Sequence, residues 1–175
     1  MERKTPLYQT HVDAGGKIVE FGGFLMPVQY PTGVLAEHMA VRQKAGLFDV
    51  SHMGELRLKG PDAVANVQKL ITADISAMQD GDIKYAMFCN DAGGILDDFI
   101  VYRCAADDYW LVVNAGNRDK DAAWVESHLF GDVDYRDEGD DWGQVALQGP
   151  TSGDILKKLC AEQYIPAKYY TFIDN

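Results

Sequence analysis

Apolar and polar residues alternate along several short stretches of the chain, with the two-residue period of a β-strand that has one buried face. Residues 55–59 alternate most regularly, and residues 85–89 and 95–102 flank a glycine-bearing loop, which predicts a hairpin. Residues 109–114 add a third strand to this meander. Further strands are predicted at 17–21, 145–150 and 169–173, a strand or loop at 47–53, and an extended but irregular segment at 22–31.

Apolar residues at helical spacing predict helices between these strands. The first helix opens near Thr5, a plausible N-cap, has Pro6 at its first position and ends at Gly15. The others are predicted at 34–45, at 117–130, at 151–160 and after Gly60-Pro61-Asp62, the last with an inward face of Val64, Val67, Leu70 and Ile71. A strand meander with helices around it indicates an α+β fold, an antiparallel sheet covered by helices.

The composition fits one domain with at most part of a second, because the chain has 175 residues of which 47% are hydrophobic. Its net charge of −11 argues against nucleic acid or an anionic membrane as the primary partner. Acidic residues concentrate at 132–141. That run lacks the spacing of a calcium-binding loop, so a solvated loop or sheet edge is predicted there.

Three widely spaced cysteines, Cys89, Cys104 and Cys160, include no Cys-x-x-Cys pair. An odd number of separated cysteines is typical of free thiols in a reducing compartment. The N-terminus has no apolar signal core, and no segment reaches transmembrane length. We therefore expect a cytosolic protein, or one whose organelle-targeting segment is absent.

None of the four histidines, at positions 11, 38, 52 and 128, lies at metal-ligand spacing with another histidine or cysteine, so no metal site is predicted. A hydrolase triad of Ser51, His52 and Asp97 is disfavoured, since adjacent side chains on an extended backbone point apart and no Gly-x-Ser-x-Gly turn is present. Phosphate-binding glycine motifs are also absent from the sequence, which gives nucleotide cofactors no support.

The most informative stretch is Gly93-Gly94-Ile95-Leu96-Asp97-Asp98, where two adjacent carboxylates interrupt a predicted strand. Alternation gives Asp97 the face of Phe99 and Val101, and gives Asp98 the opposite face. A buried lone carboxylate is costly, so the pair indicates either a solvated edge or a site. The meander also carries aromatic residues at 85, 99, 102, 109 and 110. Most of these rings could simply pack in the core, but aromatic walls beside an acid suit a flat ligand with ring nitrogens.

Several long motifs in sequence order resemble the T proteins of the glycine cleavage system. They are Thr5-Pro6-Leu7-Tyr8, Gly22-Gly23-Phe24-Leu25-Met26-Pro27-Val28-Gln29-Tyr30, Gly46-Leu47-Phe48-Asp49-Val50-Ser51-His52-Met53, the Gly93–Asp98 stretch, Val113-Asn114-Ala115 and Leu147-Gln148-Gly149-Pro150. The resemblance covers essentially the whole chain. T proteins are aminomethyltransferases that use tetrahydrofolate.

The resemblance implies a reaction, a cofactor and a set of residues. The aminomethyl group on the lipoyl arm of the H protein would give its one-carbon unit to tetrahydrofolate with release of ammonia, and no metal is implied. Asp97 matches the family's key acid, which would position folate and activate its nitrogen; Asp98 is left with a structural or solvated role. Residues matching positions in or near the folate cavity are Met53, Tyr85, Phe99, Val101, Val113, Asn114, Tyr169 and Tyr170, with Asn114 placed to pair with the pterin edge.

The resemblance also implies a partial protein, because family members continue well beyond residue 175. We expect residues 1–165 to form the N-terminal folate-binding domain and residues 166–175 to begin the next domain. Such a fragment would bind folate weakly and have no useful transferase activity alone. The alternatives are a folate-binding module of a related demethylase or of a dimethylglycine or sarcosine dehydrogenase, or a folate-binding domain without catalysis.

Overall fold

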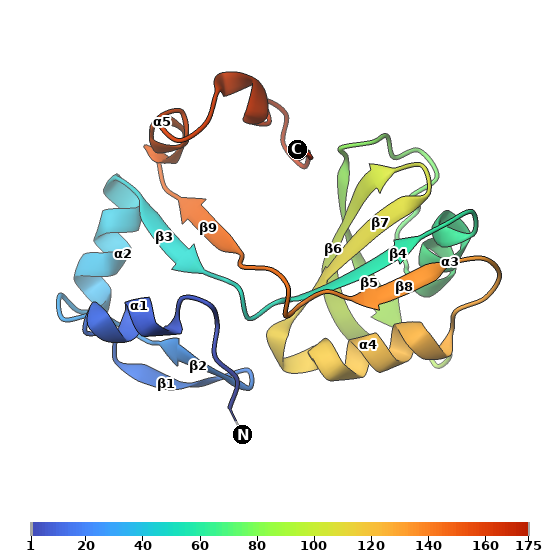
Figure 1. The fold of residues 1–175 in the computed structure, drawn as a ribbon, viewed down its shortest axis with the longest axis horizontal. Helices are drawn as coiled ribbons and strands as arrows, with labels where there is room; N and C mark the ends of the chain where they lie inside the picture. Colours follow the sequence, from blue (N-terminus) through green and yellow to red (C-terminus); the bar gives the residue numbers. More distant parts are fainter. Residues whose placement is uncertain (1, 175) are drawn as a thin grey trace. The chain divides into compact units, whose positions relative to one another are not determined.

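The computed structural model describes residues 2–174, which form two compact units (Figure 1). Unit 1 consists of the chain up to His52 together with Trp142–Ile165. Unit 2 consists of Met53–Asp141 together with the segment from Pro166 onward. Both units combine short helices with antiparallel strand pairs, as the sequence predicts.

Unit 2 is built on a five-stranded sheet in the order β5-β6-β7-β4-β8, and every neighbouring pair is antiparallel. The predicted meander is confirmed as β5 (Ile83–Cys89), β6 (Ile95–Ala105) and β7 (Asp108–Val113), and the regular alternation at 55–59 belongs to β4 (Gly54–Lys59). The acidic run contains the edge strand β8 (Asp134–Asp137). The structure thus makes this run partly a sheet edge.

One face of this sheet forms the core of unit 2, with α3 (Ala63–Leu70) and α4 (Arg118–Ser127) packed against it (Figure 1). Within α3, Val67 and Leu70 are buried as predicted, but Val64 is exposed. From α4, the side chain of Val125 is fully buried in this core. The strands contribute inward side chains at Leu56 and Leu58, Ala86 and Phe88, Phe99 and Val101, and Tyr109, Leu111 and Val113.

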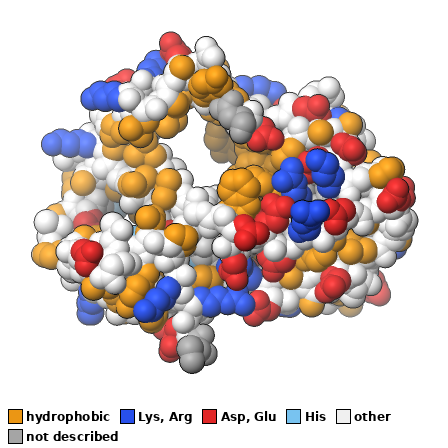
Figure 2. Space-filling view, in the orientation of Figure 1, with side chains coloured by type: hydrophobic (Ala, Val, Ile, Leu, Met, Phe, Trp, Pro, Cys, Tyr) orange, Lys and Arg blue, Asp and Glu red, His pale blue; other side chains and the backbone are white. Residues whose placement is uncertain are grey.

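Charged side chains on β4, β7 and the edge strand β8 are largely paired. Figure 2 shows basic side chains gathered among acidic ones over this part of unit 2. Arg57 donates two hydrogen bonds to Asp108, at 2.9 and 2.7 Å, and Lys59 lies 3.2 Å from the same carboxylate. Arg136 of β8 pairs with Asp134 at 2.8 Å. Charges on an edge strand oppose pairing with another chain, which is one way that proteins protect sheet edges.

The C-terminal segment of unit 2 forms a turn where residues 169–173 were predicted to be a strand. Only Thr171 is bridged, to Asp82. Tyr170 takes a left-handed backbone conformation, with φ of 56°, and this interrupts an extended run. The ring of Phe172 packs edge-on against Tyr102, with centroids 5.2 Å apart. A domain boundary after residue 165 stays a prediction.

Within the residues that the structure describes, unit 1 contains two strand pairs and three α-helices. The helices are α1 (Tyr8–Asp13), α2 (Val34–Gln43) and α5 (Ser152–Leu156), and short 3-10 turns lie at Glu162–Tyr164 here and at Ala115–Asn117 in unit 2. Strand β1 (Ile18–Phe21) pairs with β2 (Phe24–Pro27), so the segment expected to be irregular includes a regular hairpin strand. Strand β3 (Gly46–Asp49) pairs with β9 (Val145–Gln148), which joins distant parts of the sequence.

One local expectation for unit 1 is wrong, and the burial of α2 is a further finding. Thr5 does not cap α1, whose N-cap is Leu7; its hydroxyl instead donates to Asp49 at 2.6 Å. The apolar residues of α2 are not turned into a core, since none of its residues is buried and Leu35 is 83% exposed. Among the described residues, no helix combines the length and the apolar character needed to cross a membrane.

Candidate functional site

The two adjacent aspartates of β6 lie on opposite faces of the unit 2 sheet. Asp97 shares its face with Phe99 and Val101, which lie in the core, and Asp97 itself is only 5% exposed. Asp98 lies on the other face and is exposed. Its Cα partner on the neighbouring strand is Met87, two residues along from Tyr85. The sequence predicted that the two aspartates lie on opposite faces of the strand. The structure adds that the face of Asp97 is the one covered by the helices.

Asp97 is held by donors from the turn that leads into α4. The Asn114 backbone N–H donates to Oδ2 at 3.2 Å, and the Asn114 side-chain amide donates to Oδ1 at 3.0 Å. The Asn117 side-chain amide also donates to Oδ1, at 2.7 Å. Burial raises the pKa of Asp97, but hydrogen bonds from Asp121, Asn114 and Asn117 outweigh it and bring the pKa below its usual value. Asp97 is therefore a fixed, ionised carboxylate inside the fold.

Asp98 forms a different set of contacts. The Tyr85 hydroxyl donates a hydrogen bond to its Oδ2, and this bond is the main cause that raises the pKa of Tyr85. The Asn114 side-chain amide donates to the Asp98 carbonyl oxygen at 2.7 Å, so Asn114 links the two aspartates. An exposed carboxylate beside a phenol can accept a further hydrogen bond from a ligand.

A cavity of about 480 Å³ lies within unit 2, and Tyr85, the partner of Asp98, is part of its lining. Tyr85, Tyr169 and Tyr170 line it, so the structure brings together three residues that the sequence placed in one site. The rings of Tyr169 and Tyr170 contact each other with centroids 4.6 Å apart. Lys84 and Lys168 also line the cavity. Aromatic walls with two ammonium groups suit a flat ring that carries an anionic group.

Other predicted site residues do not reach this cavity. Phe99, Val101 and Val113 are 2% exposed or less, and all three pack in the core. They share the helix-covered face, and their match to folate-cavity positions stays a prediction. Met53 is half-buried in the turn before β4 and is not part of the described cavity lining.

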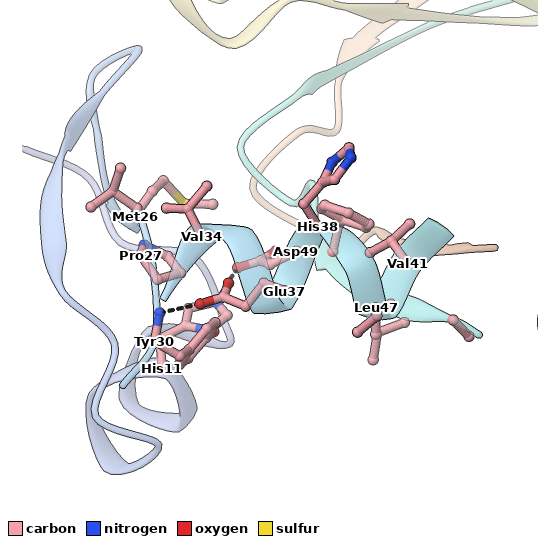
Figure 3. Close-up of a pocket in the computed structure, with 15 residues that line it drawn as sticks. His11, Met26, Pro27, Tyr30, Val34, Glu37, His38, Val41, Leu47 and Asp49 are labelled. Carbon is pink, nitrogen blue, oxygen red and sulfur yellow. Dashed lines mark hydrogen bonds and ion pairs between the residues drawn. The ribbon is translucent and has the colours of Figure 1, made fainter. Parts of the chain in front are cut away.

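A second cavity, of about 540 Å³, lies within unit 1 between α2, β2 and β3 (Figure 3). Its walls are mainly apolar, and a chain of polar groups runs along one side. His11 Nε2 donates to Asp49 at 2.8 Å, which leaves Nδ1 to accept from the Tyr30 hydroxyl at 2.8 Å. The Tyr30 backbone N–H donates to Glu37 at 2.7 Å, the bond drawn in Figure 3. No local sequence pattern predicts this network, because its members come from four separate segments.

Two other arrangements considered from the sequence are not assembled. The Ser51 hydroxyl exchanges hydrogen bonds with the backbone of Gln144, at 3.1 and 2.9 Å, and the His52 ring packs edge-on against Phe21. Neither side chain is oriented toward the other as a hydrolase requires. Over residues 2–174, no cluster of three or more histidine, cysteine or acidic side chains could hold a metal ion.

Comparison with known proteins adds a family. A family model described as the GCVT N-terminal domain matches residues 7–174. Curated relatives named aminomethyltransferase include one from Desulfitobacterium hafniense, 49% identical over 97% of this chain and 47% of the relative. Another, from Halalkalibacterium halodurans, is 43% identical over 99% of this chain and 47% of the relative. The chain thus spans about half the length of these relatives.

A solved structure gives the same result for the fold. The glycine cleavage system aminomethyltransferase T of Bartonella henselae superposes with a TM-score of 0.84 and 38% sequence identity. The match covers 90% of this chain and 44% of that protein. The α+β fold with antiparallel sheets is therefore confirmed.

Proposed function

This chain belongs to the GCVT N-terminal domain family, and on that basis we propose that it is the amino-terminal part of an aminomethyltransferase of a glycine cleavage system. In the proposed reaction, an aminomethyl group on the lipoyl arm of an H protein passes its one-carbon unit to tetrahydrofolate, and ammonia leaves. The observation that carries the proposal is the family match over residues 7–174, together with relatives named for this activity.

Tetrahydrofolate is the ligand that we propose for the cavity of unit 2. A pterin is flat and rich in N–H groups, so it can stack on Tyr85, Tyr169 and Tyr170. The glutamate end of folate is anionic, and Lys84 and Lys168 provide ammonium groups on the same cavity wall. This combination of rings and cations supports folate more strongly than a neutral aromatic ligand.

We propose that Asp98, and not Asp97, is the acid that touches folate. Asp98 is exposed beside Tyr85, whereas Asp97 is buried and its oxygens already accept three N–H groups. A carboxylate at Asp98 can accept the proton of a folate N–H as that nitrogen bonds to the one-carbon unit. Asp97 would then act by holding Asn114, whose amide oxygen is the part left for a pterin edge.

The test compares the two aspartates in the same 175-residue chain. Asp98→Asn is expected to weaken tetrahydrofolate binding about tenfold, or about 1.4 kcal/mol, with little change in stability. Asp97→Asn is expected to lower the free energy of unfolding by about 1–3 kcal/mol, because a buried acceptor of three N–H groups is replaced. Isothermal titration and urea unfolding measure the two quantities. Asp91→Asn, in the exposed turn before β6, is the matched control.

The reverse pattern, with binding lost in Asp97→Asn and kept in Asp98→Asn, would return the acid role to Asp97. Since the chain spans about half the length of its relatives, we expect weak folate binding and no useful turnover by this part alone. Turnover of aminomethylated H protein by the 175-residue chain would contradict that expectation. A methylated amine that replaces H protein as the donor would favour a related demethylase or dehydrogenase module.

For location, we propose a bacterial cytoplasm. The curated relatives named above are bacterial, and all three cysteines are free thiols. Burial raises the pKa of the Cys104 thiol to about 11, so this thiol stays protonated and unreactive at neutral pH. Free thiols suit a reducing compartment.

A further inference from the structure

The outer edge of strand β5 carries backbone groups that the sheet leaves unpaired. Strand β5 stands at one end of the sheet order, with β6 as its neighbour. The Ile83 N–H donates away from β6, to the Tyr170 carbonyl oxygen at 2.9 Å, and the Met87 carbonyl oxygen accepts from the Thr72 N–H at 3.1 Å. Backbone groups alternate between the two sides of a strand, so Tyr85 also directs its N–H and C=O away from β6.

The backbone groups between these two bonds are open. They are the Ile83 carbonyl oxygen, the N–H and carbonyl oxygen of Tyr85, and the Met87 N–H, and no residue that the structure describes pairs with them. The bonds to Tyr170 and Thr72 close the edge at both ends, about 13 Å apart at about 3.3 Å per residue. A strand of ordinary length spans about 17–20 Å, so this gap suits a small flat ligand better than another strand.

The unit 2 cavity lies against this open edge. Its lining includes Ile83, Lys84 and Tyr85 in succession, together with residues 168–170. Consecutive side chains of a strand point to opposite faces of the sheet, so a cavity lined by three in a row reaches the edge of the strand and not one face alone. Met87 is not part of the described lining. The open groups that border the cavity are therefore those of Ile83 and Tyr85.

We propose that the Ile83 carbonyl oxygen and the Tyr85 N–H recognise the edge of the ring that binds in this cavity. The two groups are neighbours on one strand edge, so they fit a flat heterocycle in which a ring N–H lies next to an acceptor atom. A ring with only donors or only acceptors there leaves one backbone group unpaired and binds more weakly. This role rests on the proposed function, because a reduced pterin has such edges. It adds selection among rings, which stacking on tyrosines alone does not provide.

Proton exchange at the Tyr85 amide is the first test. In the free 175-residue chain, the amides of Tyr85 and Met87 should both exchange rapidly with water, because neither is hydrogen-bonded. Saturating tetrahydrofolate should slow exchange at Tyr85 at least about tenfold and leave Met87 unchanged. Nitrogen-15 NMR resolves the two amides. Binding without slower exchange at Tyr85 overturns the recognition role and leaves the proposed function standing, whereas absence of binding overturns both.

Two substitutions at position 85 separate the backbone donor from the ring. Tyr85→Ala removes the ring and keeps the N–H, whereas Tyr85→Pro removes both. Proline is tolerated on an edge strand where the N–H faces outward, so both variants should fold, which urea unfolding checks. Tetrahydrofolate should bind Tyr85→Pro about threefold to tenfold more weakly than Tyr85→Ala, which is the effect of one hydrogen bond.

The matched control is Met87, whose N–H also faces outward but lies outside the described cavity lining. Met87→Pro and Met87→Ala should bind tetrahydrofolate equally. Equal affinity of Tyr85→Pro and Tyr85→Ala, or the same loss caused by proline at both positions, would overturn the recognition role. If Tyr85→Pro does not fold, exchange of the Tyr85 amide in the unsubstituted chain decides.

Discussion

Asp49 shows how one carboxylate can stabilise unit 1 and make that stability depend on pH. Burial raises the pKa of Asp49, but hydrogen bonds from Thr5, His11 and Ser51 outweigh it and lower the pKa below its usual value. The ionised form is therefore favoured by folding. Its contribution is present above the unfolded pKa, near about 4, and is lost as the pH falls through the lower folded pKa.

We predict that Asp49→Asn lowers the free energy of unfolding by about 1–3 kcal/mol at neutral pH, since several donors lose a charged acceptor. The loss should shrink toward about pH 3, where the native carboxyl is itself protonated. Urea unfolding at several pH values measures both effects. Asp13→Asn, at the exposed end of α1, should change stability little. A penalty that does not vary with pH would show that shape, and not charge, explains the role of Asp49.

At the scale of residues, the sequence correctly predicted that Asp97 and Asp98 lie on opposite faces of the strand. It did not determine which of the two faces is covered by the helices. Two adjacent aspartates in a strand must point to opposite faces. Which face meets the helices depends on α4 and the turn at Asn114 and Asn117, which lie far along the chain. The sequence did hold a hint, because Phe99 and Val101 give the Asp97 face the more apolar character. The resemblance supplied Asp97 as the key acid, and the pattern alone did not distinguish the two.

At the scale of elements, strands with regular apolar alternation were predicted well. A strand without such alternation, which depends on its pairing partner, was not predicted. Strands β5, β6 and β7 lie where the meander was expected. Strand β8 has no apolar alternation; it exists because it pairs with β4 and its charges are matched locally. Helix α2 was located correctly, but its apolar residues do not become buried. Burial depends on which elements pack together, and this information is not local.

The C-terminal segment of unit 2 supplies a prediction at the same scale. Its contacts with the sheet are few: Ile83 N–H donates to the Tyr170 carbonyl, Phe172 N–H donates to the Gly81 carbonyl, and Phe172 packs on Tyr102. Phe172→Ala should therefore release Tyr169 and Tyr170 from the cavity wall. The expected result is at least about threefold weaker tetrahydrofolate binding and a similar global unfolding free energy, because local opening does not require global unfolding.

Hydrogen exchange locates the effect of Phe172→Ala. The amides of Ile83 and Phe172 should exchange faster in the variant, and amides in the centre of β7 should not change. Ile173→Ala, an exposed neighbouring change, is the control and should leave both sets unchanged. Unchanged folate affinity in a chain with faster exchange at Ile83 would remove Tyr169 and Tyr170 from the binding site.

At the scale of the whole molecule, the fold class followed from the sequence, but the division into two units did not. Unit 1 is discontinuous, because residues 142–165 rejoin the first segment through the pairing of β3 with β9. No composition shift or linker in the sequence marks the positions where the chain passes from unit 1 to unit 2, after His52, and back again at Trp142. Pairing between two strands that are far apart in the sequence, such as β3 and β9, produces no local periodic pattern. The division into units therefore becomes visible only when the strand pairing in the structure is known.

The two units also differ in how their apolar residues are used, and this predicts unequal local stability. Strand β7 has Tyr109, Leu111 and Val113 fully buried in the core of unit 2. Helix α2 of unit 1 has no buried residue, and its Leu35 is almost fully exposed. Segments with few buried apolar contacts open at lower free energy. Amides of β7 should therefore be protected from hydrogen exchange more strongly than amides of α2, by at least about tenfold, or about 1.4 kcal/mol.

A matched pair of leucine substitutions tests the cause of this difference. Leu111→Ala should lower the protection of β7 by about 2–5 kcal/mol, because it leaves a cavity in a packed core. Leu35→Ala removes the same atoms from an exposed position and should change protection within about 0.5 kcal/mol everywhere. Mass-spectrometric hydrogen exchange on the 175-residue chain measures both variants. If α2 is protected as strongly as β7 in the unsubstituted chain, exposed α2 residues must be covered in solution. A second copy of the chain would then be the first partner to test, by sedimentation at several concentrations.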